Sequence, residues 1–165
     1  MRNFDELIDK IRFKNKLKIK LGYWKIKITK NEYSAIIKLY GSIEAFVGIY
    51  EDFSEKKSDL RNSSTTAAYF YKISNIASDS NKNKLSNKTL KEAKNLITII
   101  EEKIKFLKIS IGKISLAIKD ISTLTGEDDT ELLNYLKGSI NTANDIVIND
   151  TNKIIENINS NFKSN

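Results

Sequence analysis

Histidine, cysteine and closely spaced carboxylates carry most protein catalysis, and this 165-residue chain has no histidine and no cysteine. It therefore cannot build an imidazole base, a thiolate nucleophile, a zinc finger or an iron–sulfur site. Its neighbouring carboxylates include Glu101-Glu102, Glu51-Asp52 and Glu127-Asp128-Asp129. Adjacent residues of a helix do not face each other, so none of these groups makes an acid–base pair by itself. We expect no enzymatic activity, no cofactor and no metal site.

Lysines near the N-terminus form the most distinctive pattern in the chain. Residues 1–30 hold ten basic and three acidic side chains, whereas residues 31–165 hold 18 of each. The net charge of +7 therefore belongs to one N-terminal block. This distribution argues for a neutral body that carries one basic element, and against a uniformly basic protein.

The basic block also contains the only tryptophan, and it has no acidic residue between positions 13 and 30. A basic element with aromatic anchors can bind an acidic partner. The candidate contact residues are Lys14, Lys16, Lys18, Lys20, Tyr23, Trp24, Lys25 and Lys27. The alternative is a solvated lysine face in a chain that uses 25 lysines and three arginines, as AT-rich genomes favour. Nucleic acid and anionic lipid are further candidate partners, although specific readers of bases rely on arginine.

Arg61 is the only arginine outside the N-terminal block. It falls at an expected helix junction, in the segment Ser58-Asp59-Leu60-Arg61-Asn62-Ser63. Two interpretations are open for it: an ion pair with Asp59 or with a helix end, and a contact with a partner. We include it among the candidate partner-binding residues.

Two long amphipathic helices are the clearest elements of the sequence, and the chain has no proline to break them. The first covers residues 88–122, is capped by Ser86 or Asn87 and ends in the loop 123–126. Its apolar residues alternate spacings of three and four: Leu90, Ala93, Ile97, Ile100, Ile104, Leu107, Ile111, Ile114, Ile118 and Ile121. The second covers 128–162 through Leu133, Leu136, Ile140, Ala143, Val147, Ile154 and Ile158, with Thr151 as a polar gap.

The first half of the chain is less regular. It predicts helices at 32–57 and 59–78 and a loop at 78–84. Gly41 and Gly48 lie seven residues apart on one face of the first of these helices, which indicates close helix packing or a hinge. Residues 3–29 are ambiguous: from Lys16 onward apolar residues and lysines alternate as in strands, yet the segment also contains a helical apolar stripe. Helix is favoured there because every other element is helical.

These elements predict one all-α domain over residues 1–165, an elongated antiparallel bundle of four to five helices. No apolar run approaches the length of a membrane span. The oligomeric state is left open.

The excess of Lys, Ile and Asn, the absence of Pro and Cys and the long amphipathic helices resemble the helical outer-surface lipoproteins of Borrelia spirochaetes. Within that group, a basic bundle with a lysine-rich N-terminal element is most similar to the C-terminal domain of the fibronectin-binding lipoprotein family. The resemblance implies a non-enzymatic domain on the bacterial outer surface that binds a host protein, the complement protease C1r, and inhibits the classical pathway. It also implies a lipid anchor on a cysteine upstream of this sequence. The alternative is a cytoplasmic helical protein that binds nucleic acid or self-assembles through its long helical hairpin.

Overall fold

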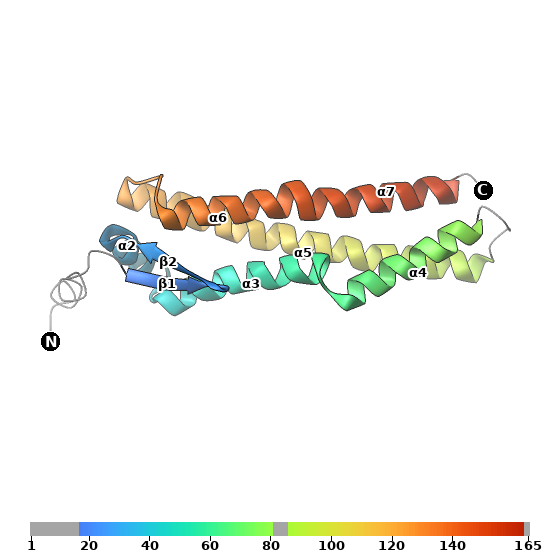
Figure 1. Cartoon of the computed structure of the whole chain (residues 1–165), viewed down its shortest axis with the longest axis horizontal. Coiled ribbons are helices and arrows are strands. Elements are labelled where there is room, and N and C mark those ends of the chain that lie inside the picture. The colour runs from blue at the N-terminus through green and yellow to red at the C-terminus, as the bar shows by residue number, and fades with distance from the viewer. Residues whose placement is uncertain (1–16, 81–85, 164–165) are drawn as a thin grey trace. The chain divides into compact units, whose positions relative to one another are not determined.

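The computed structural model describes residues 17–80 and 86–163, and this part of the chain is 84% helical. Four long helices dominate it, so the prediction of a helical, bundle-like fold is confirmed. In chain order the elements of Figure 1 are β1 (Leu17–Leu21), β2 (Trp24–Ile28), α2 (Lys30–Tyr40), α3 (Ile43–Arg61), α4 (Ser64–Ser80), α5 (Asn87–Thr125), α6 (Glu131–Thr142), the π-helical turn η2 (Ala143–Ile148) and α7 (Asn149–Lys163).

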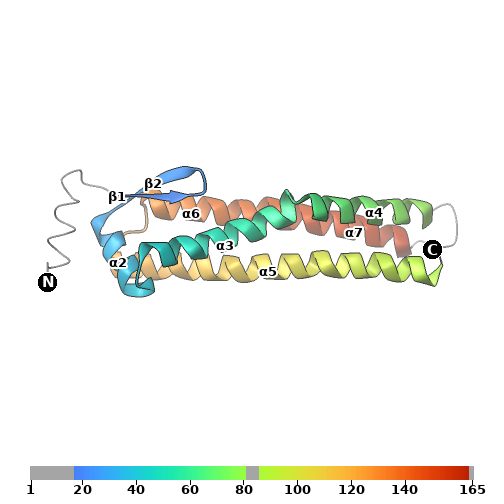
Figure 2. The same cartoon turned by 90° about the horizontal axis from the view of Figure 1, so that it is seen from below.

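The chain packs as two compact units, and helices α3 and α5 each contribute to both. The first unit contains the described residues up to 54 together with residues 110–140. In it, the end of α5 and the start of α6 run antiparallel on either side of a short loop (Figure 2). The second unit contains residues 55–109 and those from 141 onward, and α4 packs along α7 within it.

Helix α5 follows its predicted pattern closely. It runs from Asn87 to Thr125, and the Ser86 hydroxyl accepts a hydrogen bond from the Thr89 N–H at 3.2 Å, as expected of an N-cap. Leu90 and Ile118 are half-buried, and every other member of the predicted stripe is buried: Ala93, Ile97, Ile100, Ile104, Leu107, Ile111, Ile114 and Ile121.

The predicted single helix over 32–57 is wrong, because the chain breaks at Gly41. This residue adopts a left-handed backbone with φ of 85°, and its N–H donates to the carbonyl oxygen of Ile37 at 2.8 Å. Glycine is the residue that ends a helix in this conformation at least cost. The next residue, Ser42, then caps α3 by accepting a hydrogen bond from the Ala45 N–H at 3.1 Å. Helix α3 continues to Arg61, four residues beyond the predicted end.

Gly48 lies inside α3, and close packing does not explain it. The residue is exposed, and a Cβ placed on it meets nothing within 4 Å. We expect Gly48→Ala to raise the free energy of unfolding by about 1 kcal/mol, because alanine loses less backbone entropy on entering a helix. Gly41→Ala should lower it by about 1 kcal/mol, because a Cβ strains the left-handed conformation. Urea unfolding measures both, and a destabilised Gly48→Ala would show that glycine is required inside α3.

The start of α2 is anchored by a buried carboxylate. Thr29 and Glu32 form a reciprocal capping box: the Thr29 hydroxyl accepts from the Glu32 N–H at 3.1 Å, and Glu32 Oε1 accepts from the Thr29 N–H at 2.9 Å. Glu32 is fully buried, and its Oε2 accepts from the Thr130 hydroxyl at 2.8 Å. The Thr29 hydroxyl donates to Glu127 at 3.1 Å. Both threonines therefore tie α2 to the loop between α5 and α6.

Polar side chains also bridge helices within each unit. In the first unit, the Tyr50 and Tyr135 hydroxyls lie 3.1 Å apart, and the Ser110 hydroxyl donates to Asp52 at 2.8 Å. Burial, together with the bond to Tyr135, raises the pKa of Tyr50 above its ordinary value. In the second unit, Lys72 pairs with Glu92.

The second long helix is interrupted by η2, and this changes which residues it buries. Up to Val147 the predicted stripe is confirmed. Beyond it the prediction is wrong at one position: Ile154 is 41% exposed and Ile155 is buried instead, whereas Ile158 is buried as predicted. A π turn holds one more residue than an α turn, so it shifts the later stripe by one position. Thr151, the expected polar gap, is buried and donates its hydroxyl to the Val147 carbonyl at 2.7 Å.

Candidate protein-binding surface

Residues 17–28 form a β-hairpin, so the favoured helical interpretation of this segment is wrong. Strands β1 and β2 pair antiparallel, from Leu17 opposite Ile28 to Leu21 opposite Trp24. The turn between them is Gly22-Tyr23, and Gly22 has a φ of 62°, a backbone that glycine supplies without strain. An isolated hairpin is marginal in water, but this one buries one apolar face: Ile19, Leu21, Ile26 and Ile28. The predicted helical residues before position 17 lie outside the described part.

The opposite face of the hairpin is made of lysine. Lys18 lies opposite Lys27, Lys20 lies opposite Lys25, and all four side chains are exposed. Directly opposite residues of a strand pair have Cβ atoms about 5 Å apart, so like charges there destabilise the pair. Among the described residues, none of these four lysines forms an ion pair with an acidic side chain. We call these four residues the lysine face.

Two aromatic side chains lie at the turn end of the hairpin. Tyr23 is 99% exposed and Trp24 is 67% exposed. Trp24 occupies the inner-face position opposite Leu21, yet its ring is left mostly in water while Leu21 is fully buried. Large aromatic side chains in water are the residues that most often become binding hot spots.

The hairpin thus brings together six of the candidate residues named from the sequence: Lys18, Lys20, Tyr23, Trp24, Lys25 and Lys27. Lys14 and Lys16 lie outside the described residues. Arg61 belongs to the other compact unit.

Arg61 ends α3 and is exposed; it does not pair with Asp59, but its place in the last turn of α3 fits the alternative of an interaction with a helix end. The Asp59 carboxylate instead accepts from Lys103 Nζ at 2.6 Å. Burial and, to a lesser degree, the charge of Arg61 lower the pKa of Lys57. Arg61 also borders a groove of about 350 Å³, which is lined by Leu60, Arg61, Thr66, Ala67, Phe70, Ile146, Val147, Asp150, Thr151 and Ile154.

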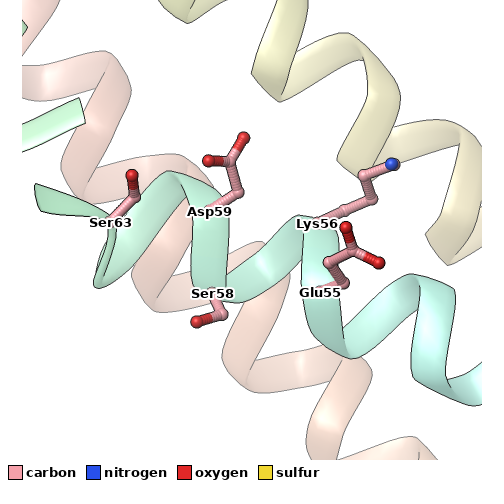
Figure 3. A pocket seen from close by; sticks show the side chains of 5 residues that line it. All are labelled: Glu55, Lys56, Ser58, Asp59 and Ser63. Carbon is pink, nitrogen blue, oxygen red and sulfur yellow. The ribbon is translucent and has the colours of Figure 1, made fainter. Parts of the chain in front are cut away.

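Two further shallow grooves lie along α3. One, of about 320 Å³, is lined by Glu55, Lys56, Ser58, Asp59 and Ser63 (Figure 3). The other, of about 230 Å³, lies between α3 and α5 and is lined by Lys56, Asp59, Ile99, Glu102, Lys103 and Phe106. The sequence pattern does not predict this second groove, because Ile99 and Phe106 lie outside the apolar stripe of α5. Within the described residues, no three carboxylates gather closely enough to hold a metal ion.

The fold and this surface define a helical bundle that displays a basic, aromatic-tipped β-hairpin. Comparisons of the chain with protein-family models, with curated proteins and with solved structures found no match. No helix in the described part of the chain is long and apolar enough to cross a membrane.

Proposed function

We propose that this is a non-enzymatic binding protein that docks the lysine face and the tip of its hairpin on an acidic surface of another protein. The observation that carries the proposal is the hairpin itself, which displays four exposed lysines in opposed pairs on its outer face and two exposed aromatic rings at its turn end. Each part of this surface has an energetic reason to favour a partner.

The first reason is electrostatic. Lys18 against Lys27 and Lys20 against Lys25 repel each other in the free protein. Carboxylates of a partner placed over the face would replace this repulsion with attraction. Complementary charge of this kind mainly speeds the encounter of two proteins and fixes their orientation.

The second reason is hydrophobic. Tyr23 and Trp24 leave most of their ring surface in water, and burying apolar surface stabilises a complex by roughly 25 cal/mol per Å². Lys20 and Lys25, the opposed pair next to the turn, add positive charge at the same end of the hairpin. The absence of arginine from residues 17–28 favours a protein over nucleic acid as the partner.

The resemblance described above makes a host serum protein the first class of partner to test, with the complement protease C1r and inhibition of the classical pathway as its sharpest form. On this proposal the protein acts at the bacterial outer surface, held there by a lipid anchor. The lysine face itself requires only that the partner be acidic.

We expect a variant with Lys18, Lys20, Lys25 and Lys27 all changed to Glu to lose the serum proteins that the parent retains in a pull-down. With a purified partner, its association should be at least about tenfold slower, because attraction becomes repulsion. This variant keeps like charges opposite each other, so the hairpin carries similar internal repulsion in both proteins. Trp24 is the only tryptophan, so a blue shift of its emission should report burial of the tip by the partner.

A matched control changes Lys94, Lys108, Lys119 and Lys153 to Glu, which alters the net charge equally at exposed helix positions. This control should bind much more like the parent. Equal loss of binding in both variants would show that overall charge, and not the lysine face, determines binding. No retained serum protein, or an oligonucleotide complex that weakens steeply with salt, would overturn the proposal.

A further inference from the structure

Helix α5 carries a second row of residues that the bundle does not cover. Its members lie three and four residues apart in strict alternation, and all are exposed: Ile99, Glu102, Phe106, Ile109, Lys113 and Leu116. The four apolar members are 37%, 51%, 49% and 57% exposed, in chain order. This spacing is that of a coiled-coil seam, in which two helices pack along apolar rows. The six residues lie along one face because α5 is a single continuous helix.

The row is symmetric about its own centre, the point between Leu107 and Lys108. Turning a second α5 by a half-turn about that point sets Ile99 against Leu116 and Phe106 against Ile109. The same operation sets Glu102 against Lys113, so the only two charges in the row become an ion pair, formed twice. A parallel arrangement in register would instead oppose Glu102 to Glu102 and Lys113 to Lys113. The charges therefore select the antiparallel pairing.

One half of the row also lines a groove. Ile99, Glu102 and Phe106 border the groove of about 230 Å³ between α5 and α3. A half-turn about the centre places Ile109, Lys113 and Leu116 of each copy over the groove of the other. Such an isologous interface closes on itself and does not extend into a filament.

We propose that the protein forms an antiparallel homodimer through this row of α5. The row spans 18 residues, about 27 Å of helix. This is a short seam, so the interface falls at the small end of specific interfaces, and we expect a dissociation constant of micromolar order. The inference is independent of the lysine face.

The test is sedimentation velocity of the full chain over a range of concentrations. The parent should shift from monomer to dimer as its concentration rises. Glu102→Lys and Lys113→Glu should each weaken dimerisation by about tenfold, because each places like charges across the seam twice. The double variant E102K/K113E should restore it, because the pair is regenerated with its signs exchanged.

This rescue cannot arise within one chain. Residues 102 and 113 are eleven positions apart, about 16 Å along the helix, so their charges do not pair in the monomer. Phe106→Glu, at a half-exposed position, should give a monomer whose circular dichroism is unchanged. Three results would overturn the proposal. The parent could stay monomeric at all concentrations, or its dimer could be unaffected by the single substitutions. The double variant could also dimerise as weakly as the two single losses added together.

Discussion

Replacing Glu32 with alanine is expected to lower the free energy of unfolding by about 3 kcal/mol. Its carboxylate accepts hydrogen bonds from the Thr29 N–H and from the Thr130 hydroxyl, and the side chain has no exposure to water. A hydrogen bond to a charged group contributes about 1.5–3 kcal/mol, and losing the acceptor leaves two donors without a partner. Urea unfolding of the parent and the variant measures the difference.

Two controls separate the network from simple loss of charge. Glu32→Gln keeps the size of the side chain, can accept from Thr29 and can donate to Thr130, so it should cost about 1 kcal/mol. Glu44→Ala removes the exposed acidic residue in the first turn of α3 and should cost well under 1 kcal/mol. If Glu32→Ala were as mild as Glu44→Ala, the buried carboxylate would not anchor α2.

Deleting one residue from the last helical run should have opposite consequences at two nearby positions. Loss of the exposed Asp145 removes the extra residue of η2, and the buried residues after it then continue the regular spacing of those before it. We expect the free energy of unfolding of the Asp145 deletion to stay within about 1 kcal/mol of that of the parent. Loss of the exposed Lys153 turns Ile155 and Ile158 by about 100° away from the core. This should cost about 4 kcal/mol, from exposure of two isoleucines.

A compensating change in η2 would not restore the stability lost in the Lys153 deletion. If η2 closed to a regular turn in compensation, Asp150 would occupy the position at which Thr151 is now buried, and an unpaired buried carboxylate is costly. Thermal and urea unfolding of the two deletions, side by side, give the comparison. An Asp145 deletion as damaging as the Lys153 deletion would show that the π turn itself is needed.

Long periodic segments were the part of this fold most accessible from sequence. Helix α5 begins and ends close to its predicted bounds because its apolar residues repeat without interruption over many turns. The error at η2 has a different origin, since a single added residue changes the phase of a helix but leaves its composition unchanged. Its trace in the sequence is the doubled apolar positions Val147-Ile148 and Ile154-Ile155, which flank Thr151.

The hairpin was misjudged because tertiary packing decided between two local patterns. The alternation of lysine with apolar residues indicates strands, whereas the helical pattern of the rest of the chain favours a helix. What tips the balance is a surface on which Ile19, Leu21, Ile26 and Ile28 are buried, and no local pattern encodes that surface. The lysines of the candidate site could nonetheless be grouped from the sequence, since charge content does not depend on the fold. Their arrangement in opposed pairs does depend on it.

The bond between Glu32 and Thr130 joins residues 98 positions apart, and this has a consequence for the order of folding during synthesis. The hairpin and α2 leave the ribosome before Thr130, and the anchor of α2 is made roughly 5–20 s later, at about 5–20 residues per second. Until then the strands have little to support them, because a two-stranded ribbon is marginal in water by itself. We therefore expect the N-terminal segment of the nascent chain to remain protease-sensitive until residues near 130 have emerged.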